Sequence, residues 1–378
     1  MSTPQVSIII PTYNLVDWID AAIDSVLGQA YPNVELIIID DGSTDKTPAH
    51  IETRQAQGDP IRYVYQPNAG QATARANGAA LAHGAFIVFL DADDWLMPNA
   101  LQAHIDAITE SPTHALTIGG SQHVDETGRV CADTRKWDRP TPDVQSWLYD
   151  VPGVNSCLMF RRTAYETVGG FDKTLRAAEE MDISLRLGMA GFTMCWTPAY
   201  VAYKLMRPGS VSDNHERIHD FTMQVLEQFF AAPNVPADLR TQRAASIAEW
   251  KWTMAASAFA AHDFETGQRW VREALALDVQ RGDQQVALHT RLFSALPPDA
   301  PQRDRWVRQV ASALPEQIRP NSQELRALLA EPYMRQFFAL NRTNPKAANR
   351  HLRAGIKHDW RWLFNHGVLR HMTTWWRY

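Results

Sequence analysis

An apolar run followed by acids, Phe86-Ile87-Val88-Phe89-Leu90-Asp91-Ala92-Asp93-Asp94, is the most informative segment of the sequence. Its apolar run predicts a strand that is buried on both faces, and three carboxylates follow that strand directly. Acids packed together repel one another and resist burial, and a divalent cation removes that penalty because carboxylate oxygens suit Mg²⁺ or Mn²⁺. We therefore predict a divalent metal site at this acidic cluster. For an acidic cluster on its own, the alternative is a solvated turn.

The residues upstream of this stretch alternate between strand and helix patterns. Apolar runs at 6–10, 34–39, 61–65 and 86–90 predict strands, and 3.6-residue periodicity predicts helices over 19–27 and 70–82. This alternation is typical of a mostly parallel sheet with right-handed crossovers and with helices on both faces. Ligands of such sheets bind beyond the carboxyl ends of the strands, where Thr12, Asp41 and Asp91 lie. The sequence has neither G-x-G-x-x-G after the first strand nor a P-loop, which disfavours a dinucleotide fold and a P-loop NTPase.

Three motifs together carry a family resemblance. Ser7-Ile8-Ile9-Ile10-Pro11-Thr12-Tyr13-Asn14, Asp40-Asp41-Gly42-Ser43-Thr44-Asp45 and Leu90-Asp91-Ala92-Asp93-Asp94 resemble, in order and spacing, the family 2 glycosyltransferases with the GT-A fold. The resemblance extends through Gly169-Gly170-Phe171-Asp172 and Glu179-Glu180-Met181-Asp182, over residues 1–215. It implies an inverting transferase that uses a nucleotide-activated sugar together with Mg²⁺ or Mn²⁺.

The resemblance also implies which residues bind the donor. These are Pro11, Thr12, Tyr13, Asp41, Arg75 and Asp91. Asp41 accepts an N–H of the base, Tyr13 stacks on the base, and the Arg75 guanidinium suits a phosphate or a base edge. The plain structural alternatives are a turn-forming aspartate, a packed tyrosine and an exposed helix arginine. Asp91 contacts the ribose and the metal, and Asp93 bridges the metal to the diphosphate.

The catalytic base is where the sequence departs from the family pattern. An inverting transfer needs a carboxylate to take the proton of the acceptor hydroxyl. Relatives place a Glu-Asp pair at this helix start, whereas this chain has Glu179-Glu180, so Glu180 is the predicted base and is one methylene longer. Glu179 and Asp182 are the alternatives, and all three acids also complement a helix dipole. Arg207 stands where many relatives have a histidine before Pro-Gly-Ser; it cannot ligate a cation but can contact phosphate, and His215 is the nearby substitute.

Composition bounds the compartment and the number of domains. The chain has 378 residues, 45% of them hydrophobic, which is ample for two domains. Its three cysteines form no C-x-x-C pattern, so neither a disulfide framework nor a zinc site is indicated. A strand within six residues of the start leaves no room for a signal peptide, and no apolar run reaches 18 residues. We therefore expect a cytoplasmic location.

The second half changes character near residue 216. Strand patterns disappear, and the apolar positions Ile247, Trp250, Met254 and Ala258, followed by Trp270, Val271, Ala274 and Leu275, predict a helical hairpin that turns at 261–263. A second hairpin is predicted over 333–358. The expected organisation is an α/β domain at 1–215, an all-α domain at 216–340 and a C-terminal tail at 341–378.

The tail is basic and rich in tryptophan. It holds eight Lys or Arg and one acid, a net charge of +7, and Trp360, Trp362, Trp375 and Trp376 lie among those charges. This mixture fits adsorption to an anionic membrane surface. The alternative is a basic helix that packs on the acidic body. Nothing in the catalytic half supports nucleic acid as a partner.

Taken together, these features predict a peripheral-membrane glycosyltransferase on the cytoplasmic face. The donor is expected to be a UDP-sugar, with GDP- and dTDP-sugars as alternatives, and the acceptor a lipid-linked or cell-surface glycan. The rival is a catalytically impaired module that binds nucleotide sugars and uses its helical half as a scaffold. The residues that favour the rival are Glu180 and Arg207.

Overall fold

The computed structural model describes residues 3–134, 137–150, 153–207, 214–277, 300–320, 322–326, 329–330, 334, 345–359 and 361. Contacts divide the chain into two compact units, Met1–Ser246 and Ile247–Tyr378, and each is described here by itself. The helices that follow the sheet, up to Arg240, group with the first unit, whereas the sequence pattern changes near residue 216. The expected three-domain organisation stays a prediction.

Nine strands are described: β1 (Val6–Thr12), β2 (Val34–Asp40), β3 (Ile61–Tyr65), β4 (Phe86–Phe89), β5 (Trp95–Leu96), β6 (His114–Val124), β7 (Val130–Thr134), β8 (Leu158–Arg161) and β9 (Thr193–Leu205). The helices of the first unit are α1 (Ile19–Leu27), α2 (Thr47–Ala56), α3 (Gln71–Ala80), α4 (Ala100–Thr109), α5 (Val144–Trp147), the 3₁₀ turn η1 (Asn155–Cys157), α6 (Arg162–Thr167), α7 (Glu179–Met189), α8 (His215–Ala231) and α9 (Ala237–Arg240). Helix α10 (Arg243–Ala260) leads into the second unit, which contains α11 (Phe264–Leu277), α13 (Ala300–Ala313), η3 (Glu316–Ile318) and α15 (Pro345–His358).

All nine strands form one mixed sheet in the order β3-β2-β1-β4-β8-β6-β9-β5, with β7 paired to β6. The four strands predicted from the sequence are parallel to one another, with Ile8 level with Leu36 and Val88. Beyond β4 the sheet is mixed, because β8 runs antiparallel to both β4 and β6 while β9 runs parallel to β6. The N-terminal end of β8 therefore lies at the same edge as the carboxyl ends of β1 and β4.

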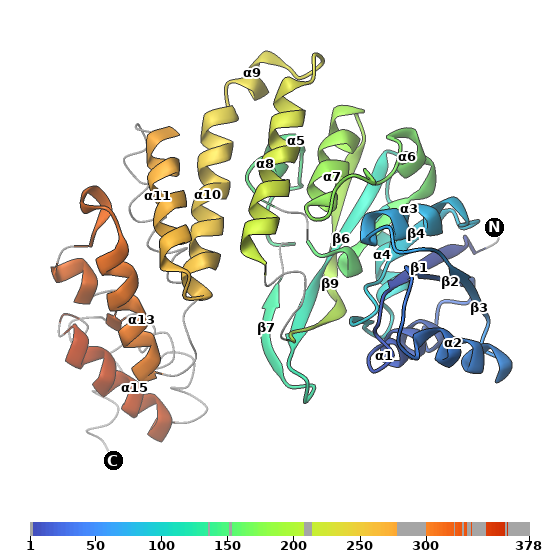
Figure 1. The fold of residues 1–378 in the computed structure, drawn as a ribbon, viewed down its shortest axis with the longest axis horizontal. Helices are drawn as coiled ribbons and strands as arrows, with labels where there is room; N and C mark the ends of the chain where they lie inside the picture. Colours follow the sequence, from blue (N-terminus) through green and yellow to red (C-terminus); the bar gives the residue numbers. More distant parts are fainter. Residues whose placement is uncertain are drawn as a thin grey trace. The chain divides into compact units, whose positions relative to one another are not determined.

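Helices cover both faces of the parallel part of the sheet, as the fold class predicts. Side chains alternate along a strand, so Ile8 of β1 joins the core cluster that includes residues of α1 and α4. Ile9 points to the other face, against α3. A Cβ on Gly78 of α3 would lie 2.4 Å from the Ile9 Cγ2 atom, so this helix sits directly on the strand. Figure 1 shows α1 and α2 on one side of β1 to β3 and α3 on the other.

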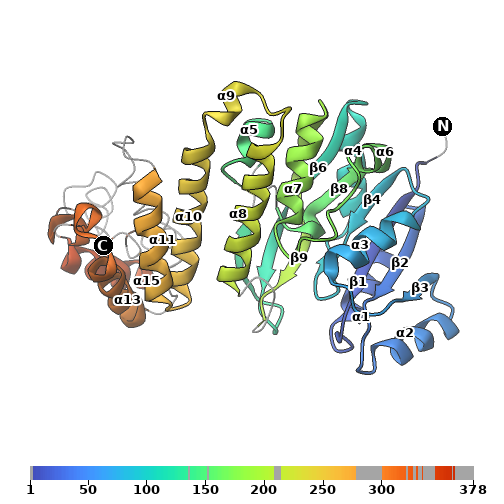
Figure 2. The ribbon, with the colours of Figure 1, turned by 45° about the horizontal axis from the view of Figure 1, so that its top comes forward.

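An aromatic cluster supports the helix that carries the predicted base. In the Gly-Gly-Phe-Asp turn, Gly169 and Gly170 have φ angles of +83° and +68°, which favour glycine. The turn sends the Phe171 ring into the core, where it lies 4.9 Å from the Phe89 ring. The Phe171 backbone N–H donates to the Tyr165 hydroxyl at 3.0 Å. Because Phe171 is anchored in this way, the start of α7 is held over the sheet, on the same face as α3 (Figure 2).

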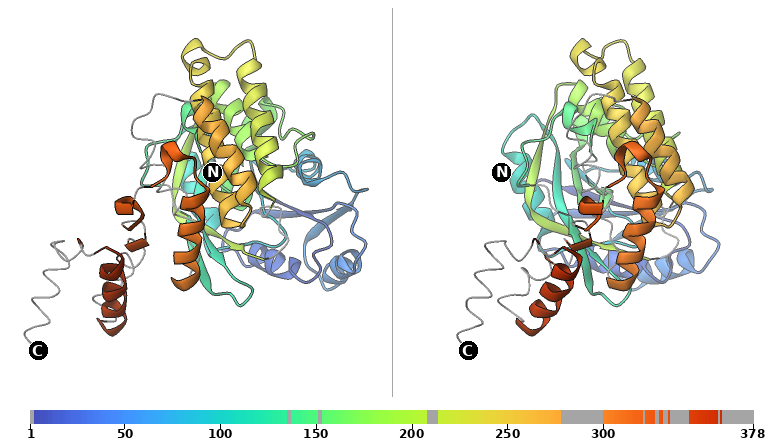
Figure 3. Two further views of the ribbon diagram at one scale, coloured as in Figure 1. Left: turned by 60° about the vertical axis from the view of Figure 1, so that its left-hand side comes forward. Right: turned by 90° about the vertical axis from the view of Figure 1, so that its left-hand side faces the viewer.

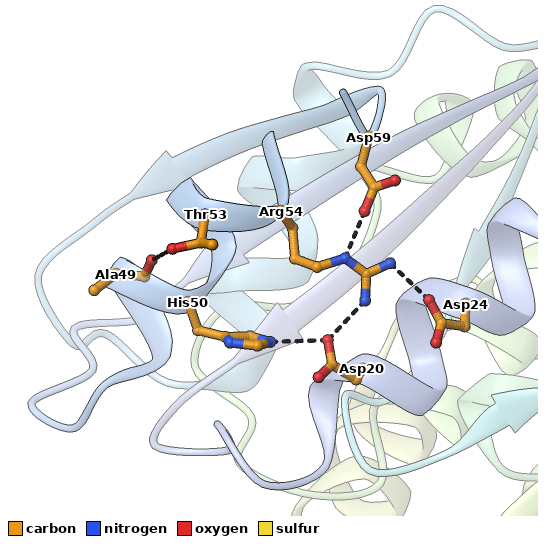
Figure 4. Close-up of polar contacts among 7 residues, drawn as sticks. All are labelled: Asp20, Asp24, Ala49, His50, Thr53, Arg54 and Asp59. Atoms are coloured by element: carbon orange, nitrogen blue, oxygen red, sulfur yellow. Dashed lines mark hydrogen bonds and ion pairs between the residues drawn. The ribbon is translucent and has the colours of Figure 1, made fainter. Parts of the chain in front are cut away.

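A charged cluster joins α1 to α2 on the first unit. The Arg54 guanidinium contacts Asp20 at 2.7 Å, Asp24 at 2.6 Å and Asp59 at 2.5 Å, and its side chain is 16% exposed. His50 also contacts Asp20, at 2.8 Å (Figure 4). Burial works to raise the pKa of Asp20, but hydrogen bonds from His50 and Arg54 outweigh it and hold that pKa below its ordinary value. The contribution of Asp20 to this cluster is therefore present only while Asp20 is ionised.

Arg54→Met should lower the free energy of unfolding by about 1–2 kcal/mol at pH 7, since it removes several charge-assisted hydrogen bonds that are partly screened by solvent. A carboxyl with a lowered folded pKa contributes stability above its unfolded pKa and loses it as the pH falls through the folded one. The penalty should therefore shrink at pH 3, as measured by urea unfolding. Arg129→Met, which removes an exposed ion pair with Asp125, is the control and should change little. An equal penalty for Arg54→Met at both pH values would show that the arginine stem, not its charge, stabilises this site.

The second unit is helical, and the first predicted hairpin is confirmed. Helices α10 and α11 are joined by a turn in which His262 has a φ of +63°, and they run alongside each other in both views of Figure 3. Of the apolar positions predicted for this hairpin, all but Leu275 are buried. Lys251 of α10 pairs with Glu273 of α11 at 2.5 Å. The Trp306 indole of α13 donates to the Phe259 carbonyl at 2.7 Å.

The remaining predictions for this half are covered only in part. Helix α15 begins at Pro345, but most of the preceding part of the second hairpin lies outside the described residues. So do Trp360, Trp362, Trp375 and Trp376 of the tail. Across the described ranges, no helix combines the length and the apolar character that a membrane crossing requires.

Candidate active site

Loops that follow the parallel strands meet at one edge of the sheet, as the strand-end positions predict. The Asp41 N–H donates to the Thr12 carbonyl at 2.8 Å, which joins the ends of β1 and β2. The Asn14 side-chain oxygen accepts the Thr44 N–H at 2.7 Å, and the Asn14 N–H donates to the Ser43 hydroxyl at 2.9 Å. These bonds fix the first two loops to each other, so both motifs face the same site.

Asp41 is buried and anchors the loop before α3. Its Oδ1 accepts the Gln66 amide at 2.7 Å and the Ala69 N–H at 2.8 Å, and its Oδ2 accepts the Gly70 N–H at 2.8 Å. Gly70 has a φ of +92°, a backbone conformation that favours glycine. A carboxylate has about four acceptor positions. Oδ2 therefore keeps one position for an N–H of a ligand.

The three consecutive residues at the end of β1 differ in their surroundings. Pro11 lies inside the strand, level with Ile39, and is buried. Thr12 is also buried, and its hydroxyl has no hydrogen-bond partner among the described residues. Tyr13 is 47% exposed, so its ring is open to a planar ligand. Tyr13 is thus the exposed residue among these three, whereas the Thr12 hydroxyl is buried.

Arg75 is not an exposed helix residue, because it is 2% exposed and surrounded by acids. Its Nη2 lies 2.5 Å from Asp91 Oδ1, and its Nη1 lies 3.7 Å from Glu179 Oε1. Burial works to lower the pKa of Arg75, but Asp91, Glu179 and Glu180 outweigh it and the pKa is raised. Arg75 was expected to face the nucleotide. Its described contacts link the acidic loop after β4 to the first turn of α7, and its contact with the nucleotide stays a prediction.

Asp93 faces Arg207, the residue that departs from the family pattern. Arg207 donates to Asp93 Oδ2 from Nε at 2.9 Å and lies 2.7 Å away through Nη2. Burial and the nearby Asp91 raise the pKa of Asp93, against the effect of Arg207. The following residue, Asp94, is buried and accepts the Ser156 hydroxyl at 2.7 Å and the Leu205 N–H at 3.2 Å. Asp94 thus anchors the acidic loop, with its neighbours facing the site.

The two acids fit the cation that the sequence predicts. Within the described residues, Asp91 Oδ2 and Asp93 Oδ1 accept no hydrogen bond from another residue, so one oxygen of each carboxylate is open. No group of three or more His, Cys, Asp or Glu side chains is placed to hold a metal in those same ranges. A site of two carboxylates fits Mg²⁺ or Mn²⁺, which commonly bind one or two carboxylates and take further oxygens from water and substrate phosphates. His215 begins α8.

Glu180 lies in the first turn of α7 and is partly exposed. The Asn155 amide donates to its Oε1 at 2.5 Å. Burial and the neighbouring Glu179 raise the pKa of Glu180, against the effect of Arg75. Asp182, an alternative base, instead accepts a hydrogen bond from Arg186 at 3.0 Å, one turn further along the helix. Glu180 is thus partly exposed and has a raised pKa, as suits a base.

Two polar residues at this site were not identified from the sequence. Asn155 contacts Glu180, and Ser156 contacts the acidic loop from both sides, since its hydroxyl also accepts the Asp91 N–H at 3.3 Å. Both precede β8. The sequence does contain a signal, a polar pair directly before a buried strand. Only the antiparallel direction of β8 brings that pair to the active edge.

Comparison with known proteins identifies the class. Residues 7–169 match the family model described as glycosyl transferase family 2. The chondroitin synthase of Escherichia coli is 28% identical over 194 residues, which are 50% of this chain and 27% of the synthase. Among solved structures, TarS of S. aureus, in a complex with UDP-GlcNAc, has a TM-score of 0.53 at 17% identity and covers 92% of this chain and 89% of TarS.

A second solved structure has the same fold. The mannosyltransferase PcManGT from Pyrobaculum calidifontis, in a complex with GDP-Man and Mn²⁺, has a TM-score of 0.52 at 18% identity and covers 78% of this chain and 86% of that one. The domain that holds residues 7–169 thus matches glycosyl transferase family 2 and has the GT-A fold. Since the match spans about a quarter of the chondroitin synthase, the activity of that whole protein does not carry over.

Proposed function

We propose that this protein is an inverting glycosyltransferase of the hexosyltransferase type that transfers a sugar from a nucleotide-sugar donor to a hydroxyl of a glycan acceptor. The observation that carries the proposal is the juxtaposition of two acidic groups from distant parts of the chain. Asp91 and Asp93 follow β4, Glu180 lies in the first turn of α7, and Arg75 lies between Asp91 and that turn. An inverting transfer needs one group for the leaving diphosphate and another for the acceptor proton.

In this proposal Glu180 acts as the general base. Its carboxylate takes the proton of the acceptor hydroxyl while the acceptor oxygen forms a bond to the anomeric carbon. The bond from that carbon to the diphosphate oxygen breaks, and the nucleoside diphosphate leaves with the electron pair. Asp41 and Tyr13 hold the base of the donor, and Thr12 offers its unpaired hydroxyl. Pro11 shapes the strand end from which Thr12 and Tyr13 project.

Asp91 and Asp93 would hold Mg²⁺ or Mn²⁺ through their open oxygens. Bound there, the cation supplies Lewis-acid stabilisation of the leaving diphosphate. Arg207 carries a positive charge beside Asp93 and can contact the same diphosphate. Arg75 holds Asp91 through an ion pair of 2.5 Å, so it acts on the donor through that carboxylate.

The donor is proposed to be a UDP-sugar, with GDP- and dTDP-sugars as alternatives. TarS was solved with UDP-GlcNAc and PcManGT with GDP-Man and Mn²⁺, which supports both the nucleotide-sugar class and the divalent metal. A chondroitin synthase among the relatives supports a glycan acceptor and a role in polysaccharide biosynthesis. We propose that this acceptor is lipid-linked or on the cell surface.

The proposed location is the cytoplasmic face of an anionic membrane, with the basic tail as the contact. The tail's net charge of +7 and its tryptophans support adsorption to anionic lipid. Deleting residues 360–378 should then abolish sedimentation with phosphatidylglycerol vesicles while donor hydrolysis persists. A misfolded deletion variant would support packing of the tail on the protein instead.

The second candidate function is a module that binds nucleotide sugars without transfer. Two observations favour it: a glutamate stands at position 180, and Arg207 occupies Asp93 Oδ2. Both functions predict donor binding, and only the first predicts turnover.

A screen of nucleotide sugars by thermal unfolding tests the proposal, because a ligand of the native state raises its melting temperature. UDP-, GDP- and dTDP-sugars are each compared with Mn²⁺, with Mg²⁺ and with EDTA. A metal-dependent rise with one nucleotide, followed by sugar transfer to a glycan, supports the enzyme. A rise without transfer to any acceptor supports the binding module, and no rise with any donor contradicts both.

A further inference from the structure

We propose that Asn155 is the positioning residue for the catalytic base, since it fixes one oxygen of Glu180 and leaves the other for the acceptor hydroxyl. This inference rests on the proposed function, in which Glu180 takes the acceptor proton. It assigns a role to a residue outside the motifs that define the family resemblance.

The contact is specific and held by a buried element. The Asn155 amide Nδ2 lies 2.5 Å from Glu180 Oε1, and Asn155 is 2% exposed. Asn155 begins η1, whose backbone is closed by the bond from the Cys157 N–H to the Val154 carbonyl at 2.9 Å. Because this turn continues directly into the buried strand β8, the amide has little freedom to move.

A fixed partner matters more for glutamate than for aspartate. The extra methylene of Glu180 adds one rotatable bond, so the carboxylate samples more positions unless something holds it. Misplacement of a reacting group by about 1 Å can cost about 100-fold in rate. A hydrogen bond on Oε1 restricts the side chain and directs Oε2 away from the amide. The longer residue can then serve in the place where relatives have a shorter one.

The same bond favours the ionised form of Glu180. An N–H donor stabilises a carboxylate more than a carboxylic acid. It therefore opposes burial and Glu179, which together raise the pKa of Glu180. Three other charged groups act on this carboxylate: Glu179 from α7, Arg75 from α3 and Asp91 from the acidic loop. Without Asn155, Glu180 should hold its proton to a higher pH, so it should act as a base over a narrower range of pH.

The oxygen of the Asn155 amide has no hydrogen-bond partner among the described residues, which separates this contact from an ordinary packing bond. Asn155 Oδ1 is buried and has no hydrogen-bond partner among the described residues. A purely structural buried amide normally satisfies both of its ends. Here the oxygen of the amide that contacts the base is left without a donor.

The neighbouring residue offers a matched control in the same turn. The Ser156 hydroxyl donates to Asp94 at 2.7 Å and accepts the Asp91 N–H at 3.3 Å, so it supports the metal loop and not the base. Asn155→Ala and Ser156→Ala therefore remove side chains of one turn that serve different carboxylates.

The test compares the pH dependence of kcat/KM for wild type, Asn155→Ala and Ser156→Ala. Asn155→Ala should lower the rate by about 10–100-fold and move the acid limb up by about one pH unit, with donor affinity unchanged, as follows from losing a hydrogen bond to a charged group. Ser156→Ala should weaken metal-dependent nucleotide binding and leave the acid limb in place. A wild-type acid limb in Asn155→Ala overturns the proposal.

A double-mutant cycle shows whether Asn155 acts through Glu180. In a Glu180→Gln background, Asn155→Ala should cause little further loss, because its target has already been removed. A full additional loss would place Asn155 in another role and overturn the inference, although the proposed function would stand. Full activity in Glu180→Gln alone would instead overturn both the base assignment and this inference.

Infrared titration of the Glu180 carboxyl, as the difference between wild type and Glu180→Gln, gives a readout that needs no acceptor. The same pKa with and without Asn155 would contradict the proposal.

Discussion

Replacing Glu180 by Gln should lower sugar transfer by about 10²–10⁴-fold while donor affinity changes little. Glutamine keeps the size of the side chain and its hydrogen-bonding shape but cannot accept the proton. The donor is unaffected because this carboxylate meets the acceptor. Initial rates of transfer and titration calorimetry with the nucleotide sugar measure the two quantities separately.

The neighbouring acids supply the controls for this prediction. Asp182→Asn should keep a rate close to wild type, because Asp182 pairs with Arg186. Glu179→Gln should be milder than Glu180→Gln, since Glu179 is buried toward Arg75 and not toward the acceptor. Glu180→Asp restores the residue of the family but shortens its reach to Asn155. Full activity in Glu180→Gln would exclude Glu180 as the base and leave Glu179 or Asp182. Equal losses at 179 and 180 would leave the base unassigned between them.

The pH dependence of the wild-type rate follows from the surroundings of Glu180. A general base works only when it is ionised, so kcat/KM should rise with pH through the pKa of that group. Burial and Glu179 raise the pKa of Glu180. The acid limb should therefore lie above the ordinary glutamate value of about 4.3. Glu180→Gln should abolish this limb in whatever activity remains.

Replacing Asp93 by Ala should abolish transfer and weaken binding of the nucleoside diphosphate in the presence of Mn²⁺. The physical reason is that the variant loses one of two open carboxylates that would hold the cation, and with it the neutralisation of the leaving group. Binding of UDP or GDP to wild type and variant, each with Mn²⁺ and with EDTA, measures the effect. EDTA should weaken binding to wild type and make little difference to the variant.

The control for this prediction is an acid far from the site. Asp106 is exposed on α4, where it accepts a hydrogen bond from Gln102, so Asp106→Ala should bind as wild type does. Equal nucleotide binding by wild type in Mn²⁺ and in EDTA, together with unchanged binding by Asp93→Ala, would refute the metal role. In that case Arg207, which lies 2.7 Å from Asp93, would be the remaining charge able to neutralise the diphosphate.

Local sequence was enough to predict the parallel half of the sheet and its acidic edge. The apolar runs of β1, β2 and β4 are long, rich in β-branched residues and flanked by polar turns, so each strand can be predicted without its neighbours. Strand-end acids then follow from topology alone, because parallel strands bring their carboxyl ends to one edge. The α10–α11 hairpin was likewise predictable, since helical periodicity is a local property.

The mixed half of the sheet was decided by tertiary packing. Strand β6 contains Gly119 and Gly120 and changes register against β9, so it lacks the regular pattern that marks a strand. A Cβ on Gly119 would lie 2.4 Å from Val201, which shows that Gly119 is required by a close approach between two strands far apart in sequence. Such an approach has no signal in the sequence around either strand.

The partners of the site's charged groups were also set only by the fold. Arg75 lies on an alanine-rich helix that, by itself, would leave it in water, and the position of α7 over α3 buries it among acids. Asn155 meets Glu180 because β8 runs antiparallel to β4, and Arg207 meets Asp93 because the chain leaves β9 at the same edge. The sequence by itself determined which chemical groups gather at the edge, because strand ends are local features. Which group faces which depends on sheet order and helix packing, because those contacts join residues that are distant along the chain.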